Sequence, residues 1–347
     1  MLKARYTKYT LDFNFEARTS RGAMWHKPTF FIEVWDDAAP WVRGLGECNH
    51  FPGLSPESQE DFEAALNAAC ISGIQETAHM PGLIFGLECA LAQLRQGGRD
   101  TIFPSEWTSG NGGITINGLV WMGDKQLMLN RIKEKLDRGF KCLKLKIGGI
   151  DFDDELRLLS YIREAFNEDV LELRVDANGA FAPDEALKKI DRLSVFHIHS
   201  IEQPIRQGHI KEMAKICELS PIPVCLDEEL IGVKTDEEKA YVLDEIRPKY
   251  IILKPALCGG LGHADKWIEL AVTRNVGWWV TSALESNVGL SALAQWTAEK
   301  SPSMPQGLGT GALYSNNLPS PIIQKGQSLF FTGEGDYRNQ SSSILWT

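Results

Sequence analysis

Residues 141–148 read KCLKLKIG, a run in which lysines alternate with apolar residues. On a β-strand successive side chains point to opposite faces, so we expect two or three of these lysines to share one face. Lysine is rarely buried without a partner, because an unpaired buried ammonium group is costly. The rest of the chain should therefore place anionic groups opposite this strand.

Around this run, strand-like and helix-like patterns alternate. Each helical pattern follows one of the apolar runs at 114–120, 141–148, 171–176, 199–202, 224–227, 250–254 and 278–282. Such units specify parallel strands joined by helical crossovers of one hand. Seven or eight units without a GxGxxG turn after the first strand favour a closed barrel over an open doubly wound sheet.

Residues 1–110 have a different pattern, with strand-like runs first and helical patterns after them. The first helical pattern is expected to start at Ser55, with Pro56 as its first helical residue. This order predicts an α+β domain. We place the barrel domain at 111–317 and assign the C-terminal segment 318–347 to the first domain.

The polar segment 18–28 separates two strands of the first domain. Its Ser, Gly and Pro residues predict a loop. With two arginines and a tryptophan, this loop would suit a lid over an anionic, partly apolar ligand. A solvated hairpin loop explains the same residues equally well.

Four strands of the barrel region end in the charged residues Asp176, Glu202, Asp227 and Lys254, at intervals of 26, 25 and 27 residues. Each interval is about one strand–helix unit, so all four residues should lie at the carboxyl ends of their strands, where barrel enzymes carry active sites. One such residue alone is more often a helix cap or a loop charge. Three carboxylates on consecutive strands, however, need a cation, and all-oxygen ligation suits Mg²⁺, with Mn²⁺ as an alternative.

Lys146 and Lys254 come from strands on either side of the carboxylates, so they should face each other across the metal. A proton next to a substrate carboxylate is removed more easily when a cation and an ammonium group offset the charge of the ene-diolate that forms. The base must be a neutral amine, and the positive charge of Lys144 favours that form of Lys146. These residues predict abstraction of an α-proton by Lys146.

The overall composition excludes several classes of protein. The chain has 347 residues and a net charge of −10, so it has no basic field to hold nucleic acid or an anionic membrane. No run approaches the roughly 20 apolar residues of a membrane span, and the N-terminus lacks a signal-peptide pattern. The seven cysteines show no CxxC spacing and indicate free thiols. We expect a cytoplasmic protein that binds a small-molecule carboxylate.

Five motifs together resemble the enolase superfamily, in its muconate-lactonizing-enzyme subgroup. The motifs KLKIG, VDANGAF, IEQP, LDEEL and ILKP contain, in order, Lys144 and Lys146, Asp176, Glu202, Asp227 and Lys254. The match covers nearly the whole chain. It implies an α/β fold with a modified TIM barrel, (β/α)₇β, which is closed by an N-terminal α+β capping domain.

Within the subgroup, further segments are similar to the o-succinylbenzoate synthase family. They are TSRG at 19–22, GECNHFPGLSPE at 46–57, FGLECAL at 85–91, Asn117-Gly118, ALESNVGL at 283–290 and GLGTGALYSNN at 307–317. The resemblance implies a Mg²⁺-dependent syn-dehydration of 2-succinyl-6-hydroxy-2,4-cyclohexadiene-1-carboxylate to 2-succinylbenzoate in menaquinone biosynthesis. Lys146 would remove the α-proton, and Lys254 would stay charged against the ring as a cation–π partner.

The same lysines and carboxylates are shared by N-acylamino acid racemases and dipeptide epimerases, in which both lysines exchange protons. Dipeptide epimerases carry Asp-x-Asp on the last barrel strand, where this chain has GTGA at 309–312. The backbone N–H groups there suit an anion such as the succinyl carboxylate, which favours the synthase over the dipeptide enzyme and leaves the racemase open. We expect substrate contacts from Ser20, Arg21, Asn117, Ser286, Gly309 and Thr310.

Glu228, Cys142 and Cys225 also have expected positions or roles. Glu228 follows a predicted metal ligand and would either orient a lysine or act as a charge at a helix N-terminus. The two cysteines are expected to point outward into the helix layer. A catalytically inactive barrel is disfavoured, because buried charges without a function are costly.

Overall fold

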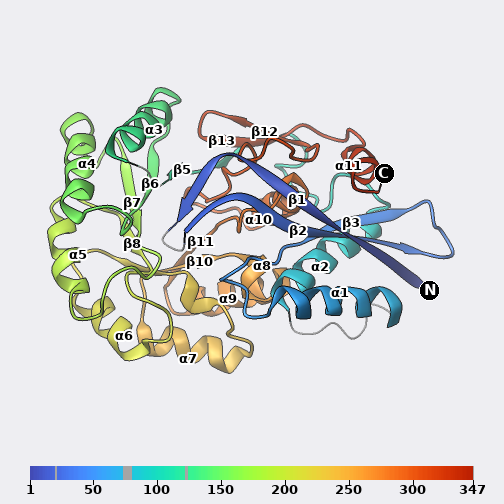
Figure 1. The fold of residues 1–347 in the computed structure, drawn as a ribbon, viewed down its shortest axis with the longest axis horizontal. Coiled ribbons are helices and arrows are strands. Elements are labelled where there is room, and N and C mark those ends of the chain that lie inside the picture. Colours follow the sequence, from blue (N-terminus) through green and yellow to red (C-terminus); the bar gives the residue numbers. More distant parts are fainter. Residues whose placement is uncertain (20–21, 73–79, 122–123, 347) are drawn as a thin grey trace.

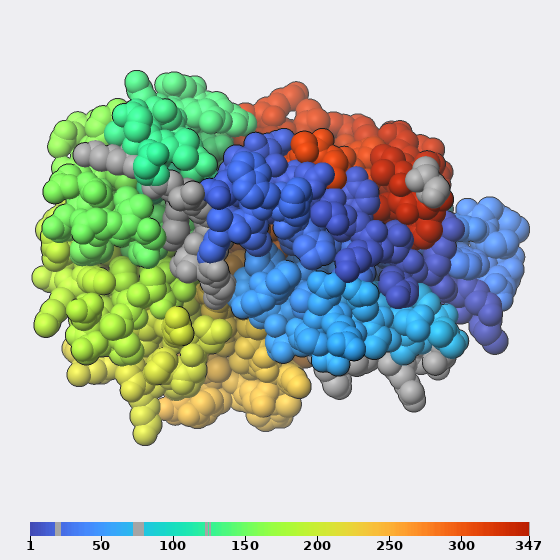
Figure 2. Space-filling model, viewed as in Figure 1, coloured from blue at the N-terminus to red at the C-terminus, as the bar shows by residue number. Residues whose placement is uncertain are grey.

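The computed structural model describes residues 1–19, 22–72, 80–121 and 124–346. A barrel of parallel strands surrounded by helices lies beside an antiparallel sheet with its own two helices (Figure 1). Figure 2 shows the N-terminal residues, in blue, packed directly against the barrel. Among the described residues, no helix has the length and apolar character that a membrane span requires.

The barrel is built on a seven-stranded parallel sheet in the order β11-β10-β9-β8-β7-β6-β5. Its two edges are joined by an eighth segment, because Ile116 pairs with Gln306 and Thr281 pairs with Gly307, both in parallel. The expected (β/α)₇β barrel is therefore confirmed. Its strands are β5 (Gly118–Val120), β6 (Cys142–Lys146), β7 (Glu172–Asp176), β8 (Ser200–Glu202), β9 (Val224–Leu226), β10 (Tyr250–Leu253) and β11 (Gly277–Val280).

A helix follows each barrel strand from β5 to β11, as the alternating patterns of the sequence predict. Several starts have local caps: Asp124 accepts a hydrogen bond from the backbone of Leu127, and Thr235 forms a capping box with Glu238. The helices are α3 (Lys125–Asp137), α4 (Phe152–Ala165), α5 (Ala186–Ser194), α6 (Ile210–Leu219), α7 (Asp236–Ile246), α8 (Pro255–Cys258), α9 (Leu261–Thr273) and α10 (Asn287–Glu299).

The N-terminal capping unit has three antiparallel strands with two helices packed on one face. Gly44 and Gly46 permit the close approach of the second helix, since a Cβ atom at either residue would lie within 2 Å of a helix carbonyl oxygen. A separate apolar core, which includes Phe30, Phe62 and Leu83, fills the space between sheet and helices. The elements are β1 (Leu2–Thr19), β2 (Gly22–Asp36), β3 (Arg43–Cys48), α1 (Gln59–Ser72) and α2 (Pro81–Arg95).

Two local predictions for the capping unit are wrong. Helix α1 begins at Gln59 rather than near Ser55, because the Ser55 hydroxyl group accepts the backbone N–H of Phe51 in the preceding turn and Ser58 caps the helix instead. The described part of 18–28 is strand, since β1 and β2 form one long hairpin. Trp25 and His26 of this segment are exposed, whereas Lys27 is buried.

The C-terminal segment contacts both units. Strands β12 (Ile322–Lys325) and β13 (Ser328–Phe331) form a small antiparallel sheet with β4 (Ile114–Thr115). Helix α11 (Tyr337–Leu345) lies against the capping sheet, where Leu345 packs with Phe31. The domain boundary near residue 110 and the assignment of 318–347 to the capping domain stay predictions.

Deep in the barrel lies a group of side chains that we call the lower layer. Arg174 on β7 stacks over the ring of Trp279 on β11 at 4.2 Å, although β8, β9 and β10 separate the two strands in the sheet. This contact therefore crosses the interior of the barrel. Arg174 also donates to Glu172 Oε1 at 2.6 Å and to the Pro305 carbonyl at 2.9 Å. The lower layer consists of Cys142, Glu172, Arg174, Cys225 and Trp279.

The outward orientation predicted for the two cysteines of this layer is wrong. Cys142 shares the strand parity of Lys146, and Cys225 shares that of Asp227, so both cysteines point into the barrel and not into the helix layer. Cys142 Sγ donates to Glu172 Oε1 at 3.3 Å. Lys141 has the opposite parity and is exposed outside β6, so only two lysines of the KCLKLK run face inward.

Candidate active site

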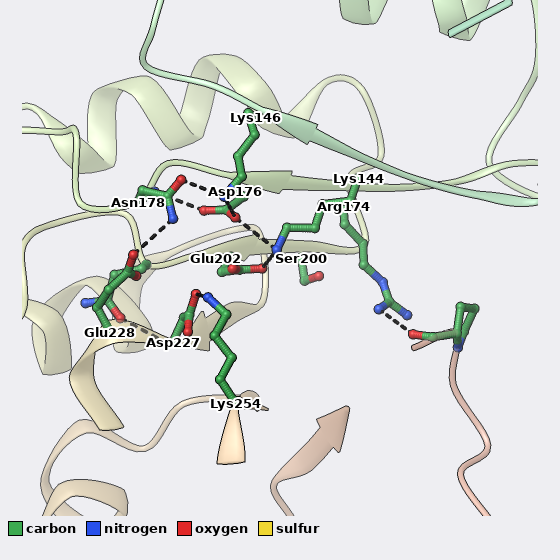
Figure 3. A network of polar contacts seen from close by, with 12 residues as sticks. Lys144, Lys146, Arg174, Asp176, Asn178, Ser200, Glu202, Asp227, Glu228 and Lys254 are labelled. Carbon is green, nitrogen blue, oxygen red and sulfur yellow. Dashed lines mark hydrogen bonds and ion pairs between the residues drawn. The ribbon is translucent and has the colours of Figure 1, made fainter. Parts of the chain in front are cut away.

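The three predicted metal ligands occupy adjacent strand ends. In the register of the parallel strands, Lys146 lies beside Asp176 and Asp176 lies beside Glu202, so these residues form one row across three strands. Asp227 directly follows β9, the next strand. The three acidic residues are at most 2% exposed. The structure thus places side by side the carboxylates that the sequence intervals predict to meet (Figure 3).

Three amino groups contact these carboxylates. Lys144 Nζ lies 2.9 Å from Asp176 Oδ2 and also contacts Glu202. Lys146 Nζ lies 2.5 Å from the same Asp176 oxygen. Lys254 Nζ contacts Asp227, and in Figure 3 it approaches the carboxylates from the side opposite Lys146. The upper layer of the barrel consists of these six residues: Lys144, Lys146, Asp176, Glu202, Asp227 and Lys254.

The charges of the upper layer depend on one another. Burial raises the pKa of Glu202 well above its usual range, and the charge of Asp176 raises it further. Burial would also raise the pKa of Asp176, but the ammonium groups of Lys144 and Lys146 outweigh it and lower that pKa. Burial opposes the charged form of Lys144, yet the carboxylates of Asp176 and Glu202 prevail and raise its pKa. The carboxylates therefore require nearby positive charge.

The upper layer fits a hard divalent cation. Among the described residues, no group of three His, Cys, Asp or Glu side chains has the arrangement of a formed metal site, and the ammonium groups of Lys144 and Lys254 lie against the carboxylates. Glu202 Oε1, however, is buried and has no hydrogen-bond partner in the described part of the chain. Adjacent carboxylates with an unpartnered buried oxygen suit Mg²⁺ or Mn²⁺, which prefer oxygen ligands.

Asn178 links the two sides of the site and was not singled out from the sequence. Its Oδ1 accepts a hydrogen bond from Lys146 Nζ at 2.7 Å, and its Nδ2 donates to Glu228 Oε1 at 3.0 Å. The residue has a positive φ of 44°, and its backbone N–H donates to Asp176 Oδ1 at 3.0 Å. Burial opposes the charged form of Lys254, but the charges of Asp227 and then Glu228 act against it, and its pKa is raised. Both roles expected for Glu228 agree with the structure, since it is linked to Lys146 through Asn178 and is also the first residue of a short 3₁₀ helix, Glu228–Leu230.

Gln203 ties neighbouring strand ends together. Its side-chain oxygen accepts the backbone N–H groups of Asp227 at 3.1 Å and Glu229 at 3.2 Å. Its own backbone N–H donates to the Cys225 carbonyl at 2.9 Å. These bonds fix the backbone on which Glu202 and Asp227 are mounted.

A cavity of about 270 Å³ opens onto the upper layer. The two predicted catalytic lysines, Lys146 and Lys254, line it together with Lys144. Its walls come from both units, since the capping unit contributes hairpin and loop residues and the barrel contributes strand ends. The apolar wall residues include Met24, Phe51, Leu54, Leu119, Trp121, Leu257 and Leu284.

Three of the predicted substrate-binding residues line this cavity: Asn117, Gly309 and Thr310. Asn117 Oδ1 and Thr310 Oγ1 are buried without a hydrogen-bond partner in the described part of the chain. Thr281, which we did not predict, lines the cavity as well, and its Oγ1 has no partner among the same residues. It directly follows β11, so the rule that located Asp227 and Lys254 would also have found it.

The other predicted substrate contacts are not in the cavity wall that the structure describes. Ser286 is fully buried, its hydroxyl group donates to Glu47 Oε2 at 2.6 Å, and it does not line the cavity. The resemblance placed it near the pocket, but its position at the start of α10 commits it to a helix cap. Ser20 and Arg21 lie outside the described residues.

Comparison with known proteins identifies the class to which this fold and site belong. Residues 127–322 match the family model described as "Enolase C-terminal domain-like". The chain belongs to the enolase superfamily.

The chain is also similar to individual proteins of this class. The chain is 46% identical to an o-succinylbenzoate synthase from Desulfotalea psychrophila, over 94% of this chain and 98% of that protein. The crystal structure of MenC from the same organism has a TM-score of 0.85 and 43% identity, and it covers 95% of this chain and 99% of that one. An L-Ala-D/L-Glu epimerase from Bacillus subtilis is 28% identical over 69% of this chain and 59% of that protein.

Proposed function

We propose that this chain is a metal-dependent lyase that catalyses the o-succinylbenzoate synthase reaction. That reaction is the syn-dehydration of 2-succinyl-6-hydroxy-2,4-cyclohexadiene-1-carboxylate to 2-succinylbenzoate. The observation that carries the proposal is the 46% identity to an o-succinylbenzoate synthase over nearly the full length of both proteins. The upper layer and the cavity above it provide the groups that this reaction needs.

Lys146 is the proposed base. In its neutral form, its Nζ takes the proton next to the substrate carboxylate, and the electron pair of the broken C–H bond moves into an ene-diolate. The resulting ammonium group then returns the proton to the departing hydroxyl group, which leaves as water. One residue on one face of the ring serves both half-reactions, which accounts for the syn stereochemistry. Asn178, which accepts from Lys146 Nζ, orients this amine.

Lys254 is proposed to stay charged on the opposite side of the ring. Asp227 contacts its Nζ, and both Asp227 and Glu228 favour its ammonium form. An ammonium group against the face of a ring that becomes aromatic contributes a cation–π attraction as the product forms. It also offsets the negative charge of the ene-diolate.

Asp176, Glu202 and Asp227 would hold Mg²⁺, or Mn²⁺ in its place. When bound, the ion supplies positive charge that stabilises the substrate carboxylate as it gains electron density. Lys144, in contact with Asp176 and Glu202, keeps these two carboxylates in position.

The cavity suits a ring that carries an apolar edge and a second carboxylate. Met24, Phe51 and Leu54 give it one apolar wall. On the barrel side, Thr281 and Thr310 present hydroxyl groups that can donate to a carboxylate. We propose that the succinyl carboxylate binds there, beside Gly309.

A second candidate function is racemisation of N-acylamino acids. It is favoured by one observation, namely that both Lys146 and Lys254 line the cavity and approach the carboxylates from opposite sides. Two opposed bases can exchange the α-proton of one carbon on either face. Dipeptide epimerisation uses the same lysines, but the segment at 309–312 lacks the paired aspartates expected for it.

A paired assay with Mg²⁺ tests these functions. Dehydration of the cyclohexadiene acid is followed by the appearance of the aromatic product, and α-proton exchange into D₂O is followed for N-acylamino acids and dipeptides. Fast dehydration with slow exchange supports the synthase. Fast exchange of both enantiomers with slow dehydration would replace it with the racemase, and Lys254 would then be a second base.

A further inference from the structure

A fully buried lysine lies close to the cavity in the capping unit. Gly22, Ala23 and Met24, at the start of β2, line the cavity. Lys27 follows on the same strand and is only 1% exposed. Burial of an ammonium group is costly unless it is paired and hydrogen-bonded, so its surroundings require an explanation. Lys27 takes no part in the proposed chemistry.

Lys27 is the first member of a chain of buried hydrogen bonds. Its Nζ donates to Asn49 Oδ1 at 2.6 Å. Asn49 Nδ2 donates to the Ala283 carbonyl at 2.9 Å and lies 3.3 Å from Glu285 Oε1. Glu285 Oε2 in turn accepts the hydroxyl group of Ser282 at 2.5 Å. We call Lys27, Asn49, Glu285 and Ser282 the buried bridge.

The buried bridge joins two walls of the cavity. One end is β2, whose first residues line the cavity from the capping side. The other end is the segment after β11, where Ser282, Ala283 and Leu284 line it from the barrel side. Every member of the bridge is at most 4% exposed, so water competes little for these hydrogen bonds.

The two carboxylates near Lys27, those of Glu47 and Glu285, are held in place by residues of the barrel. Burial lowers the pKa of Lys27, and the carboxylates of Glu47 and Glu285 act against this shift. Glu47 accepts the Ser286 hydroxyl group at 2.6 Å and the backbone N–H of Gly289 at 3.1 Å, at the N-terminus of α10. Lys27 therefore lies within the field of two carboxylates, one held by the β11–α10 loop and one by the helix that follows it.

We propose that Lys27 is a positioning residue, whose buried ammonium group fixes the cavity-lining start of β2 to the barrel loop at 282–285 and thereby sets the width of the substrate cavity. Its effect on substrate binding rests on the proposed function; its effect on the hairpin does not.

The test compares Lys27→Met with the matched control Lys8→Met. Lys8 lies on the neighbouring strand β1, where its half-exposed amino group pairs with Glu63 on α1. Hydrogen exchange of the free protein, read by mass spectrometry, needs no substrate. We expect K27M to accelerate exchange of peptides covering 22–30 and 280–286 by roughly tenfold, whereas K8M leaves both unchanged. Unchanged exchange at both peptides in folded K27M would overturn the proposal.

Kinetics provide the second readout. K27M should raise KM for the cyclohexadiene acid by roughly tenfold and change kcat by less than about threefold, since a displaced wall weakens binding of ground state and transition state alike. A wild-type KM in K27M, in a preparation that is active, would contradict the proposal even if the hairpin exchanges faster. If the wild-type protein is inactive, only the proposed function is contradicted, because the exchange experiment tests the role of Lys27 without substrate.

Glu285→Gln makes the same test if K27M does not fold. The glutamine keeps the shape of the side chain and an oxygen for Ser282, and it removes both the charge that acts on Lys27 and the oxygen that accepts from Asn49 Nδ2. We expect faster exchange at the same two peptides and a severalfold rise in KM. In the double variant the KM effect should not exceed that of K27M, because both changes break one bridge. Fully additive effects would show that the two residues act independently and would overturn the proposal.

Discussion

The upper and lower layers of the barrel interior are two residues apart on shared strands, yet they differ in nearly every physical respect. Both contain buried charges: Asp176 lies in the upper layer, and Arg174 of the same strand lies in the lower one. The upper layer opens onto the cavity through its lysines, whereas Arg174 is covered by Trp279. The upper layer gathers three carboxylates, while the lower layer holds one carboxylate, Glu172, against one guanidinium group.

This difference shows that buried charge in a barrel does not by itself indicate function. Arg174 is held by Glu172, by the Pro305 carbonyl and by an aromatic face, and its Nη2 is buried without a hydrogen-bond partner among the described residues. Glu202 lies beside two other carboxylates, Asp176 and Asp227, and although Lys144 contacts it, one of its buried oxygens has no partner among the described residues. Access to a cavity together with three adjacent carboxylates distinguishes the site, and each prediction below tests that distinction.

The largest expected effect is that of Lys146→Ala. Removal of the proposed base should lower kcat for dehydration by about 10³-fold, with the fold intact, because general acid–base catalysis typically contributes that much. The matched control is Lys141→Ala, which removes an exposed lysine from the same sequence run and should leave kcat unchanged. Wild-type turnover in K146A, with a normal circular dichroism spectrum, would refute the assignment of the base.

The next largest effect concerns metal affinity. Glu202→Gln in the upper layer should raise the Kd for Mg²⁺ by at least about 100-fold, because even residues that only support a ligand cost 10- to 100-fold. Isothermal titration calorimetry measures this directly. Glu172→Gln, which changes a carboxylate of the lower layer, should leave the Kd within about threefold. Equal effects of the two substitutions would remove the distinction between the layers.

Arg174→Met tests the lower layer by its stability. Loss of the bonds to Glu172 and Pro305 and of the contact with Trp279 should cost about 2 kcal/mol, measured as the free energy of unfolding in urea. The half-buried position of Glu172 keeps this figure below that for a fully buried ion pair. The kcat value should stay within about threefold of wild type. A large loss of kcat at unchanged stability would mean that the lower layer contributes to catalysis.

The sequence predicts the upper layer well for a physical reason. Lys146, Asp176, Glu202 and Asp227 are located by strand periodicity and by the repeat of strand–helix units, both of which are properties of neighbouring residues. Thr281 obeys the same rule and was overlooked. Cys142 and Cys225 have the strand parity of Lys146 and Asp227, so the sequence also contains the information for their inward orientation.

The residues of the cavity walls could not be predicted from the sequence in the same way. Phe51 and Leu54 reach the cavity only because the capping unit docks on the barrel, and no local pattern encodes that contact. Ser286 was expected to bind substrate, yet it pairs with Glu47, a residue 239 positions away in the chain. Lys27 likewise depends on Asn49 and Glu285 for its partners. Such long-range pairings become visible only in the folded structure.

The smallest predicted effect lies just outside the upper layer, at a carboxylate that holds the loop after Lys146. Glu155 on α4 is 2% exposed, and its Oε1 accepts the backbone N–H groups of Gly148 at 2.6 Å and Gly149 at 3.2 Å. Burial raises its pKa from 4.5 to about 7, although these bonds and the charge of Lys189 act in the opposite direction. Glu155 is therefore a structural carboxylate that titrates near neutral pH.

The consequence for stability follows from the direction of this shift. Because the folded state holds the proton more tightly than the unfolded chain, the group stabilises the fold below about pH 4.5, and this contribution is lost as pH rises to about 7. Glu155→Gln removes the titration. Relative to this variant, the wild type should lose on the order of 1–2 kcal/mol of unfolding free energy between pH 5 and pH 8. Urea denaturation at the two pH values measures the change, with Glu164→Gln, an exposed residue of the same helix, as the control. A difference between wild type and E155Q that is the same at both pH values would show that Glu155 ionises normally, and the loop after Lys146 would then be held independently of pH.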